Sequence, residues 1–216
     1  MYHVPSFNES DTTILRELVR HHPLATIINH DADGGLNANH IPLIWCDDGS
    51  EHGVLRGHIA RANPLCNDHA NGSDILAIFQ GASGYISPSW YATKAETHKV
   101  VPTYNYTALH AHGRLMIKDD TDWLLALLND LTDKHELSLK TPWSVSDAPT
   151  EYIQQMMKVI IGIEISIHSL QGKWKVSQNQ PQRNQASVLK NLTELGQNDM
   201  AKLVNQRMKP TDKGTQ

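Results

Sequence analysis

Hydrophobic and polar positions alternate along much of this chain, and this pattern predicts a protein built mainly on β-strands. In residues 159–168 the apolar set is Val159, Ile161, Ile163, Ile165 and Ile167. A period of two places alternate side chains on opposite faces of a strand, so this segment is expected to bury one face. Residues 104–117 alternate in the same way, and shorter strands are expected at 24–29, 38–45, 53–59 and 74–80.

Helical periodicity appears in separate segments between and after the strands. Residues 11–21 carry an apolar stripe behind a cap at Ser10 or Asp11, and Asp120 or Thr121 can cap a longer helix with a leucine stripe. A short helix is expected from Pro149 to Met157. Two more helices, at 181–195 and 199–208, form a C-terminal helical extension, and Gly196 is expected to end the first of them.

A tight reversal is expected at Gln171-Gly172, with residues 173–179 returning as a strand. Lys173, Lys175 and Ser177 then share one face, which suits a phosphate or another anion. The alternative is a solvated edge strand, whose lysines discourage aggregation. The lysines alone fit that alternative better, whereas the run Ser-Gln-Asn at 177–179 is less expected of a plain edge.

Composition argues against several classes of protein, namely nucleic-acid-binding, secreted, membrane-spanning and disulfide-rich proteins. The 216 residues carry a net charge of −4 without a block of Lys or Arg, which argues against strong sequence-independent nucleic-acid binding. The start of the chain shows no basic region followed by an apolar run, and no apolar run is long enough to span a membrane. Two cysteines are too few for a disulfide framework. We therefore expect a soluble, cytoplasmic protein without a membrane partner.

No repeat or linker divides the chain. We expect one domain over residues 1–208, followed by a disordered tail at 209–216.

Aromatic rings and hydroxyl groups are concentrated between Gly84 and Tyr106. The rings are Tyr85, Trp90, Tyr91, Tyr104 and Tyr106, and the polar groups among them are Ser87, Ser89, Thr103 and Asn105. Rings with a few placed donors and acceptors are typical of a pocket for a planar ligand with polar edges. A core hairpin whose aromatic polar atoms find ordinary partners explains the composition equally well.

Histidines offer two further candidate sites. His58 and Arg61 stand at i and i+3, where they could face an anion together, although an ordinary ion pair explains such a spacing better. His110 and His112 share one face of a strand, but a metal site needs another ligand and the sequence indicates none. A structural or cofactor-contacting role is therefore expected for both, and no metal.

Four motifs in order resemble the PaiB family of FMN-binding negative transcriptional regulators, relatives of split-barrel flavoproteins such as pyridoxamine phosphate oxidases. These motifs are GHIARANP at 57–64, YISPSWY at 85–91, VPTYNY at 101–106 and GKWKVSQN at 172–179. The resemblance covers nearly the whole chain. Tyr104 stands where the family usually has Trp, which leaves ring stacking available.

The resemblance implies a mainly β (α+β) fold, namely an FMN-binding split antiparallel β-barrel with peripheral helices and a C-terminal helical extension. It also implies a homodimer with FMN in clefts at the dimer interface. The residues matched to that cleft are His58, Arg61, Asn63, Ser87, Trp90, Tyr91, Thr103, Asn105, Lys175, Ser177 and Gln178. Among them, Lys175, Ser177 and Gln178 are expected near the phosphate.

The function that the resemblance implies is negative regulation of transcription, direct or indirect, with DNA or the transcription machinery as a partner. No helix-turn-helix with a basic second helix is visible, so direct binding to an operator is doubtful. The alternatives are an FMN-dependent oxidoreductase of the pyridoxamine phosphate oxidase-like group and a haem-binding split-barrel protein, since the chain has 13 histidines. No catalytic residue is assigned.

Overall fold

The computed structural model describes residues 1–2, 4–66 and 70–208. The chain divides into two compact units. Unit 1 comprises Met1–Leu15, Gln80–Leu109 and Gln171–Gln216, and unit 2 comprises Arg16–Phe79 and His110–Leu170. The expected disordered tail at 209–216 lies outside the described residues, and a single domain over 1–208 stays a prediction.

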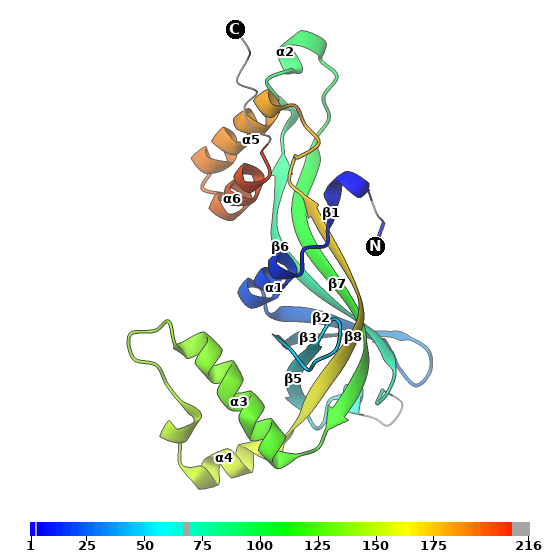
Figure 1. Cartoon of the computed structure of the whole chain (residues 1–216), viewed down its shortest axis with the longest axis vertical. Coiled ribbons are helices and arrows are strands. Elements are labelled where there is room, and N and C mark those ends of the chain that lie inside the picture. The colour runs from blue at the N-terminus through cyan, green and yellow to red at the C-terminus, as the bar shows by residue number, and fades with distance from the viewer. Residues whose placement is uncertain (3, 67–69, 209–216) are drawn as a thin grey trace. The chain divides into compact units, whose positions relative to one another are not determined.

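The strands form an antiparallel sheet, as the alternating pattern predicts. They are β1 (Asn8–Glu9), β2 (Leu24–His30), β3 (Leu36–Pro42), β4 (Ile44–Cys46), β5 (Val54–Ala60), β6 (Asp74–Ile86), β7 (Thr103–Lys118) and β8 (Ile160–Lys175). Their hydrogen-bonded order is β3-β2-β6-β7-β8-β5-β4, with β1 beside β8 (Figure 1). The three long strands β6, β7 and β8 contribute residues to both units.

The helices also follow the sequence pattern closely. They are α1 (Thr12–His21), α2 (Lys94–Thr97), α3 (Thr121–Glu136), α4 (Thr150–Met157), α5 (Gln182–Glu194) and α6 (Asn198–Gln206), with short 3-10 turns at Pro5–Phe7, Pro64–Cys66, Pro88–Trp90 and Val145–Asp147. Asp120 caps α3 by accepting the backbone N–H of Trp123 at 2.9 Å. None of the helices in the described part of the chain is long and apolar enough to cross a membrane.

In unit 2, β2 and β3 form a hairpin from Leu24↔Pro42 to His30↔Leu36, and β5 pairs with β8 from Val54↔Ser166 to Ala60↔Ile160. Strand β8 buries one face as expected, because Ile163 and Ile165 are fully buried while Ser166 and His168 on the other face are exposed. Helices α3 and α4 lie beside each other, with Leu124, Leu127, Met157 and Ile44 in one apolar cluster (Figure 1).

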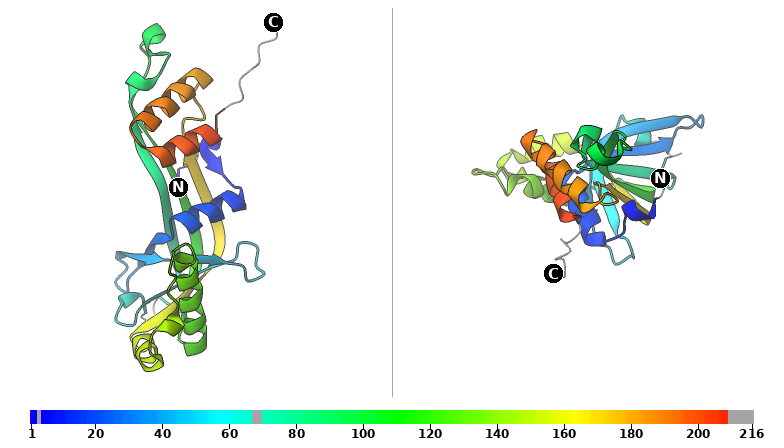
Figure 2. Two further views of the ribbon diagram at one scale, coloured as in Figure 1. Left: turned by 90° about the vertical axis from the view of Figure 1, so that its left-hand side faces the viewer. Right: turned by 90° about the horizontal axis from the view of Figure 1, so that it is seen from above.

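In unit 1, helices α5 and α6 lie side by side in both directions of view (Figure 1, Figure 2). Their apolar faces form a cluster with the end of β6 and the residues after β8. Its buried members are Ile86, Tyr91, Val176, Val188, Leu192, Met200, Ala201 and Val204. Gly196, at φ +70°, ends the turn after α5, in agreement with the expected stop.

The reversal expected at Gln171-Gly172 is wrong, because β8 continues through both residues to Lys175. Strand β1 pairs alongside at this point, with Glu9 opposite Gly172. A Cβ on Gly172 would lie 2.4 Å from the Glu9 carbonyl oxygen. This glycine therefore serves a close approach of two backbones, and the sequence pattern alone does not distinguish that use from a turn.

Candidate functional site

A cavity of about 480 Å³ lies in unit 1, where the start of β7 meets the residues that follow β8. It is lined by Tyr91, Thr93, Thr97, Lys99, Val100, Val101, Thr103, Asn105, Lys175, Ser177, Asn179, Gln180, Pro181 and Asn184. The lining contains two lysines, several hydroxyl and amide groups, and no carboxylate. Two stretches far apart in the sequence thus supply one cationic, polar pocket.

Lys175 lines this cavity and links β8 to the start of β7. Its Nζ donates to the Thr103 hydroxyl and, at 2.7 Å, to the Tyr104 carbonyl oxygen. Burial lowers the pKa of Lys175, and nearby Lys173 acts in the same direction. No carboxylate pairs with Lys175 among the described residues, so its charge is balanced only by neutral oxygens. An anionic group in the cavity would supply the missing opposite charge.

Ser177 is held beside Lys175 by a buried network. Asn105 Nδ2 donates to Ser177 Oγ at 2.9 Å, and Gln185 Nε2 donates to the Ser177 carbonyl oxygen at 3.0 Å. Ser177 has φ +67°, in the left-handed region that residues other than glycine rarely adopt. Such a conformation persists where surrounding contacts enforce it, which is common at binding sites.

Asn184, in the first turn of α5, hydrogen bonds to two other lining residues, Thr93 and Gln180. Its Oδ1 accepts the Thr93 backbone N–H at 3.1 Å, and its Nδ2 donates to the Thr93 hydroxyl at 3.1 Å and to Gln180 Oε1 at 3.2 Å. Asn184 is buried, with 2% of its surface exposed. Sequence reasoning missed Thr93, Asn184 and Lys99 as pocket residues, because no local pattern links a helix start to the loop before β7.

The ring region expected around Trp90 is divided between pocket and core. Tyr91 lines the cavity and also packs in the apolar cluster of unit 1, and burial raises the pKa of its phenol. Trp90 packs against the same cluster. Ser87 Oγ accepts the backbone N–H of Ser89 and shapes the turn before these rings. This segment therefore supplies Tyr91 to the cavity lining and packs both Tyr91 and Trp90 in the apolar core, and its use as a pocket for a planar ligand stays a prediction.

The side-chain amide of Gln178 forms hydrogen bonds with the backbone of the preceding residues. Its Oε1 accepts the Val176 N–H at 2.8 Å, and its Nε2 donates to the Trp174 carbonyl oxygen. Gln178 is absent from the cavity lining, whereas its neighbours Ser177 and Asn179 are present. The amide thus shapes the chain as it leaves β8.

The remaining candidates, His58, Arg61 and Asn63, belong to unit 2. His58 lies on β5, its Nδ1 is buried without a partner among the described residues, and burial lowers the pKa of the imidazole. Arg61 is exposed and forms an ion pair with Asp119, as the alternative reading of His58 and Arg61 predicts. Asn63 Nδ2 donates to Asn39 Oδ1 at 2.8 Å. Asn39 Nδ2 is likewise buried and unpartnered in the described chain, so this group has polar atoms available to a ligand.

The donor set of the unit 1 cavity fits a phosphorylated, hydroxyl-rich molecule. A partly buried ammonium suits a phosphate, amide and hydroxyl groups suit a polyol, and the Tyr91 ring adds flat apolar surface. A free carboxylate, which would repel a phosphate, is missing from the lining.

Comparison with known proteins identifies the family of this chain. Residues 1–169 match the family model described as "Putative FMN-binding domain". The chain is 34% identical to the uncharacterized protein AN0679 of Emericella nidulans, over 95% of this chain and 96% of that protein. It is 27% identical to protease synthase and sporulation protein PAI 2 of Bacillus subtilis, over 89% of each.

Among solved structures, the chain is similar in fold to the FAD and heme binding protein of Mycobacterium smegmatis. The TM-score is 0.58 at 17% sequence identity, over 78% of this chain and 73% of that one. This likeness confirms the expected antiparallel split-barrel sheet with added helices.

Proposed function

Since the chain belongs to the PaiB-type family of FMN-binding domains, we propose that the cavity of unit 1 is its FMN site. Lys175 and Ser177 hold the phosphate, and Thr103 and Asn105 contact the polyol chain beside it. The observation that carries this assignment is the partly buried Lys175 ammonium, which has only neutral oxygen partners in a cavity without carboxylates. Tyr91 and the adjoining Trp90 supply the aromatic surface for the flavin ring.

The protein's contribution is to bind and orient the flavin. Bound FMN supplies reversible one- and two-electron chemistry, and the residues around it decide its orientation and access to solvent. The hydrogen bonds from Asn105 and Gln185 keep Ser177 in its left-handed conformation, so its hydroxyl is positioned before the ligand arrives. Preorganisation of this kind reduces the entropic cost of binding.

We further propose a homodimer in which His58, Arg61 and Asn63 also line the flavin cleft. The unpartnered, buried Nδ1 of His58 supports this role, because a buried polar atom is ordinarily hydrogen bonded. Gln178 acts in this scheme by holding the backbone of Trp174 and Val176, which directly precedes Ser177. Cys46 and Cys66 are both free, in keeping with a cytoplasmic location.

The proposed output is negative regulation of transcription, with flavin binding or flavin redox state shifting the protein between two states. Support comes from the Bacillus relative, whose name refers to protease synthase and sporulation. The net charge of −4 disfavours direct contact with DNA phosphates. The protein is therefore proposed to act through a partner of the transcription machinery rather than by reading an operator itself.

Removal of the gene should raise a defined set of transcripts, because a repressing activity is lost. RNA sequencing of the deletion strain measures this effect, and complementation should restore repression with the wild-type chain but not with the variant Lys175→Ala/Ser177→Ala. In a gel-shift at low salt, the FMN-loaded protein should not retard its own upstream DNA.

Two results would count against regulation. An unchanged transcript profile in the deletion strain would remove the regulatory proposal. Sustained oxidation of NADH or NADPH by the FMN-loaded protein with a small acceptor would favour the oxidoreductase alternative. The visible spectrum of the purified protein should show flavin bands, and a Soret band would indicate haem instead.

A further inference from the structure

One side of helix α3, in unit 2, is exposed and acidic. Its exposed residues recur every three or four positions, so they form one stripe along the helix. They are Asp122, Ala126, Asp130 and Asp133, with Leu137 as the next position of the stripe. The other side of α3 carries the leucines that pack in the apolar cluster of unit 2. The three aspartates form no ion pair within the described chain, so their charge is left uncompensated.

The chain that follows α3 presents apolar side chains at the end of this stripe (Figure 1). Leu137 is 76% exposed, Leu139 53% and Trp143 45%. Glu136 holds this segment, because its carbonyl oxygen accepts the Leu139 N–H at 2.8 Å and its Oε2 accepts the Trp143 N–H at 2.9 Å. The backbone is thus tied down by hydrogen bonds while large apolar side chains stay in contact with solvent.

A surface of this kind is typical of an interaction site. Single exposed leucines are ordinary on a monomer, whereas apolar side chains gathered beside charged ones mark docking surfaces. Tryptophan is also enriched among the residues that contribute most to protein–protein binding. The residues of this surface, named the α3 patch, are Asp122, Asp130, Asp133, Leu137, Leu139 and Trp143.

We propose that the α3 patch binds a cationic, amphipathic segment of a partner protein. Lysine or arginine side chains of the partner meet the unpaired aspartates, and its apolar side chains lie against Leu137, Leu139 and Trp143. Charge complementarity identifies this occupant, since the aspartates need cations and the tryptophan needs apolar cover. For its biological role the inference rests on the proposed regulation through a protein partner, and it states the chemistry of that partner.

A second copy of this chain is the main competing occupant. In a dimer with two-fold symmetry, the same patch lies on both sides of the interface. The aspartates of the two copies would then face each other, and opposed like charges are unfavourable. A membrane with anionic lipids would be repelled in the same way. The charge of the α3 patch therefore favours a cationic partner.

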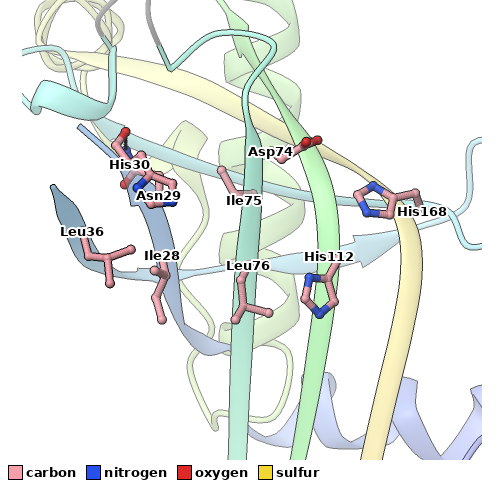
Figure 3. A pocket seen from close by; sticks show the side chains of 9 residues that line it. All are labelled: Ile28, Asn29, His30, Leu36, Asp74, Ile75, Leu76, His112 and His168. Atoms are coloured by element: carbon pink, nitrogen blue, oxygen red, sulfur yellow. Dashed lines mark hydrogen bonds between the residues drawn. The ribbon is translucent and has the colours of Figure 1, made fainter. Parts of the chain in front are cut away.

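The cavity of unit 2 is a separate feature. Its volume is about 360 Å³, and Figure 3 shows its lining side chains on strands of the sheet. None of the lining residues belongs to the α3 patch. Leu36 and Asp74 line this cavity, so substitutions of these two residues report on the cavity rather than on the patch.

The test is a titration of the full chain, without added FMN, with a fluorescein-labelled amphipathic peptide of lysine and leucine. Its fluorescence anisotropy should rise saturably as the peptide binds. The same peptide with glutamate at every lysine should not bind, because it meets the aspartates with like charge. The peptide with serine at every leucine should bind at least about tenfold more weakly, because it lacks apolar anchors.

Leu137→Ser/Trp143→Ser should weaken binding of the lysine–leucine peptide about 30-fold, because it removes the tryptophan and the most exposed leucine of the patch. Leu24→Ser/Leu36→Ser is the matched control, since it removes two exposed apolar side chains from β2 and β3. The control should leave the affinity within about twofold of the wild-type value.

Asp130→Asn/Asp133→Asn should weaken binding about fivefold at low salt, the size expected of two exposed ion pairs. The effect should shrink as salt screens the charges. Asp33→Asn/Asp74→Asn makes the same charge change at exposed positions outside the patch and should have no effect.

Four results would each overturn the proposal. They are the absence of saturable binding, equally tight binding of the glutamate peptide, equal effects of the patch and control variants, and conversion of a dimer to a monomer by Leu137→Ser/Trp143→Ser in analytical ultracentrifugation. An unchanged transcript profile in the deletion strain would remove the regulatory role but leave peptide binding intact, so the two failures are distinguishable.

Discussion

The double variant Lys175→Ala/Ser177→Ala should bind FMN about 100-fold more weakly than the wild-type chain, while its affinity for riboflavin falls less than about threefold. A charge-assisted hydrogen bond contributes about 1.5–3 kcal/mol and a neutral one about 1 kcal/mol. Their sum corresponds to roughly two decades in Kd. Riboflavin has no phosphate, so it makes neither of these contacts and its binding does not depend on them. Quenching of flavin fluorescence on binding measures both constants.

Lys94→Ala/Ser89→Ala is the matched control for this experiment. Lys94 Nζ donates to Ser89 Oγ at 3.2 Å, so the control removes a lysine–serine pair of the same chemistry. Both residues belong to unit 1 and neither lines the cavity. The control should leave FMN binding unchanged. If the Lys175 variant weakens FMN and riboflavin equally, the phosphate is held elsewhere and the assignment of Lys175 and Ser177 is wrong.

The lowered pKa of Lys175 adds a pH signature to the same titration. The ammonium carries its charge below this pKa, and the FMN phosphate is a dianion above about pH 6. FMN affinity should therefore be greatest between these limits and fall as pH rises through the pKa of Lys175. Lys175→Arg should abolish the fall, because a guanidinium stays charged throughout this range. A wild-type profile that matches Lys175→Arg would contradict the prediction.

Gly113→Ala should lower the free energy of unfolding by about 2–3 kcal/mol, as expected when atoms are forced into a packed core. A Cβ at Gly113 on β7 would lie 2.5 Å from Ile165 Cγ2 and 2.6 Å from the Ser166 carbonyl oxygen. The second contact is with backbone on β8, which cannot move without disturbing the sheet. Urea unfolding followed by circular dichroism measures the change.

Gly84→Ala is the control, since it makes the same substitution in another long strand. Its Cβ would lie 2.6 Å from Gln197 Oε1, at the far end of a flexible side chain that can turn aside. The expected change in unfolding free energy is within about 1 kcal/mol. Equal destabilisation by the two variants would show that loss of glycine, rather than the backbone contact at Gly113, is responsible.

Much of the fold could be predicted from local pattern. The alternation in 159–168, the cap at Asp120 and the glycine stop at Gly196 each depend on residues close in sequence, and all agree with the structure. Gly172 is the instructive failure. Its small size serves the approach of β1, a segment more than 160 residues earlier in the chain, and local sequence cannot reveal such a partner.

The candidate site divides in the same way. The sequence by itself determined the chemistry, since the hydroxyl and amide groups at 103–105 and the lysine and serine at 175–177 stand out as ligand-binding residue types. Only the tertiary structure decided that these stretches share one cavity and that Asn184 and Thr93 also line it. It also decided that the Gln178 amide forms its hydrogen bond with the nearby backbone instead of lining the cavity. The physical reason is that residue type sets which bonds a side chain can make, whereas the packing of distant strands and helices sets which partner it meets.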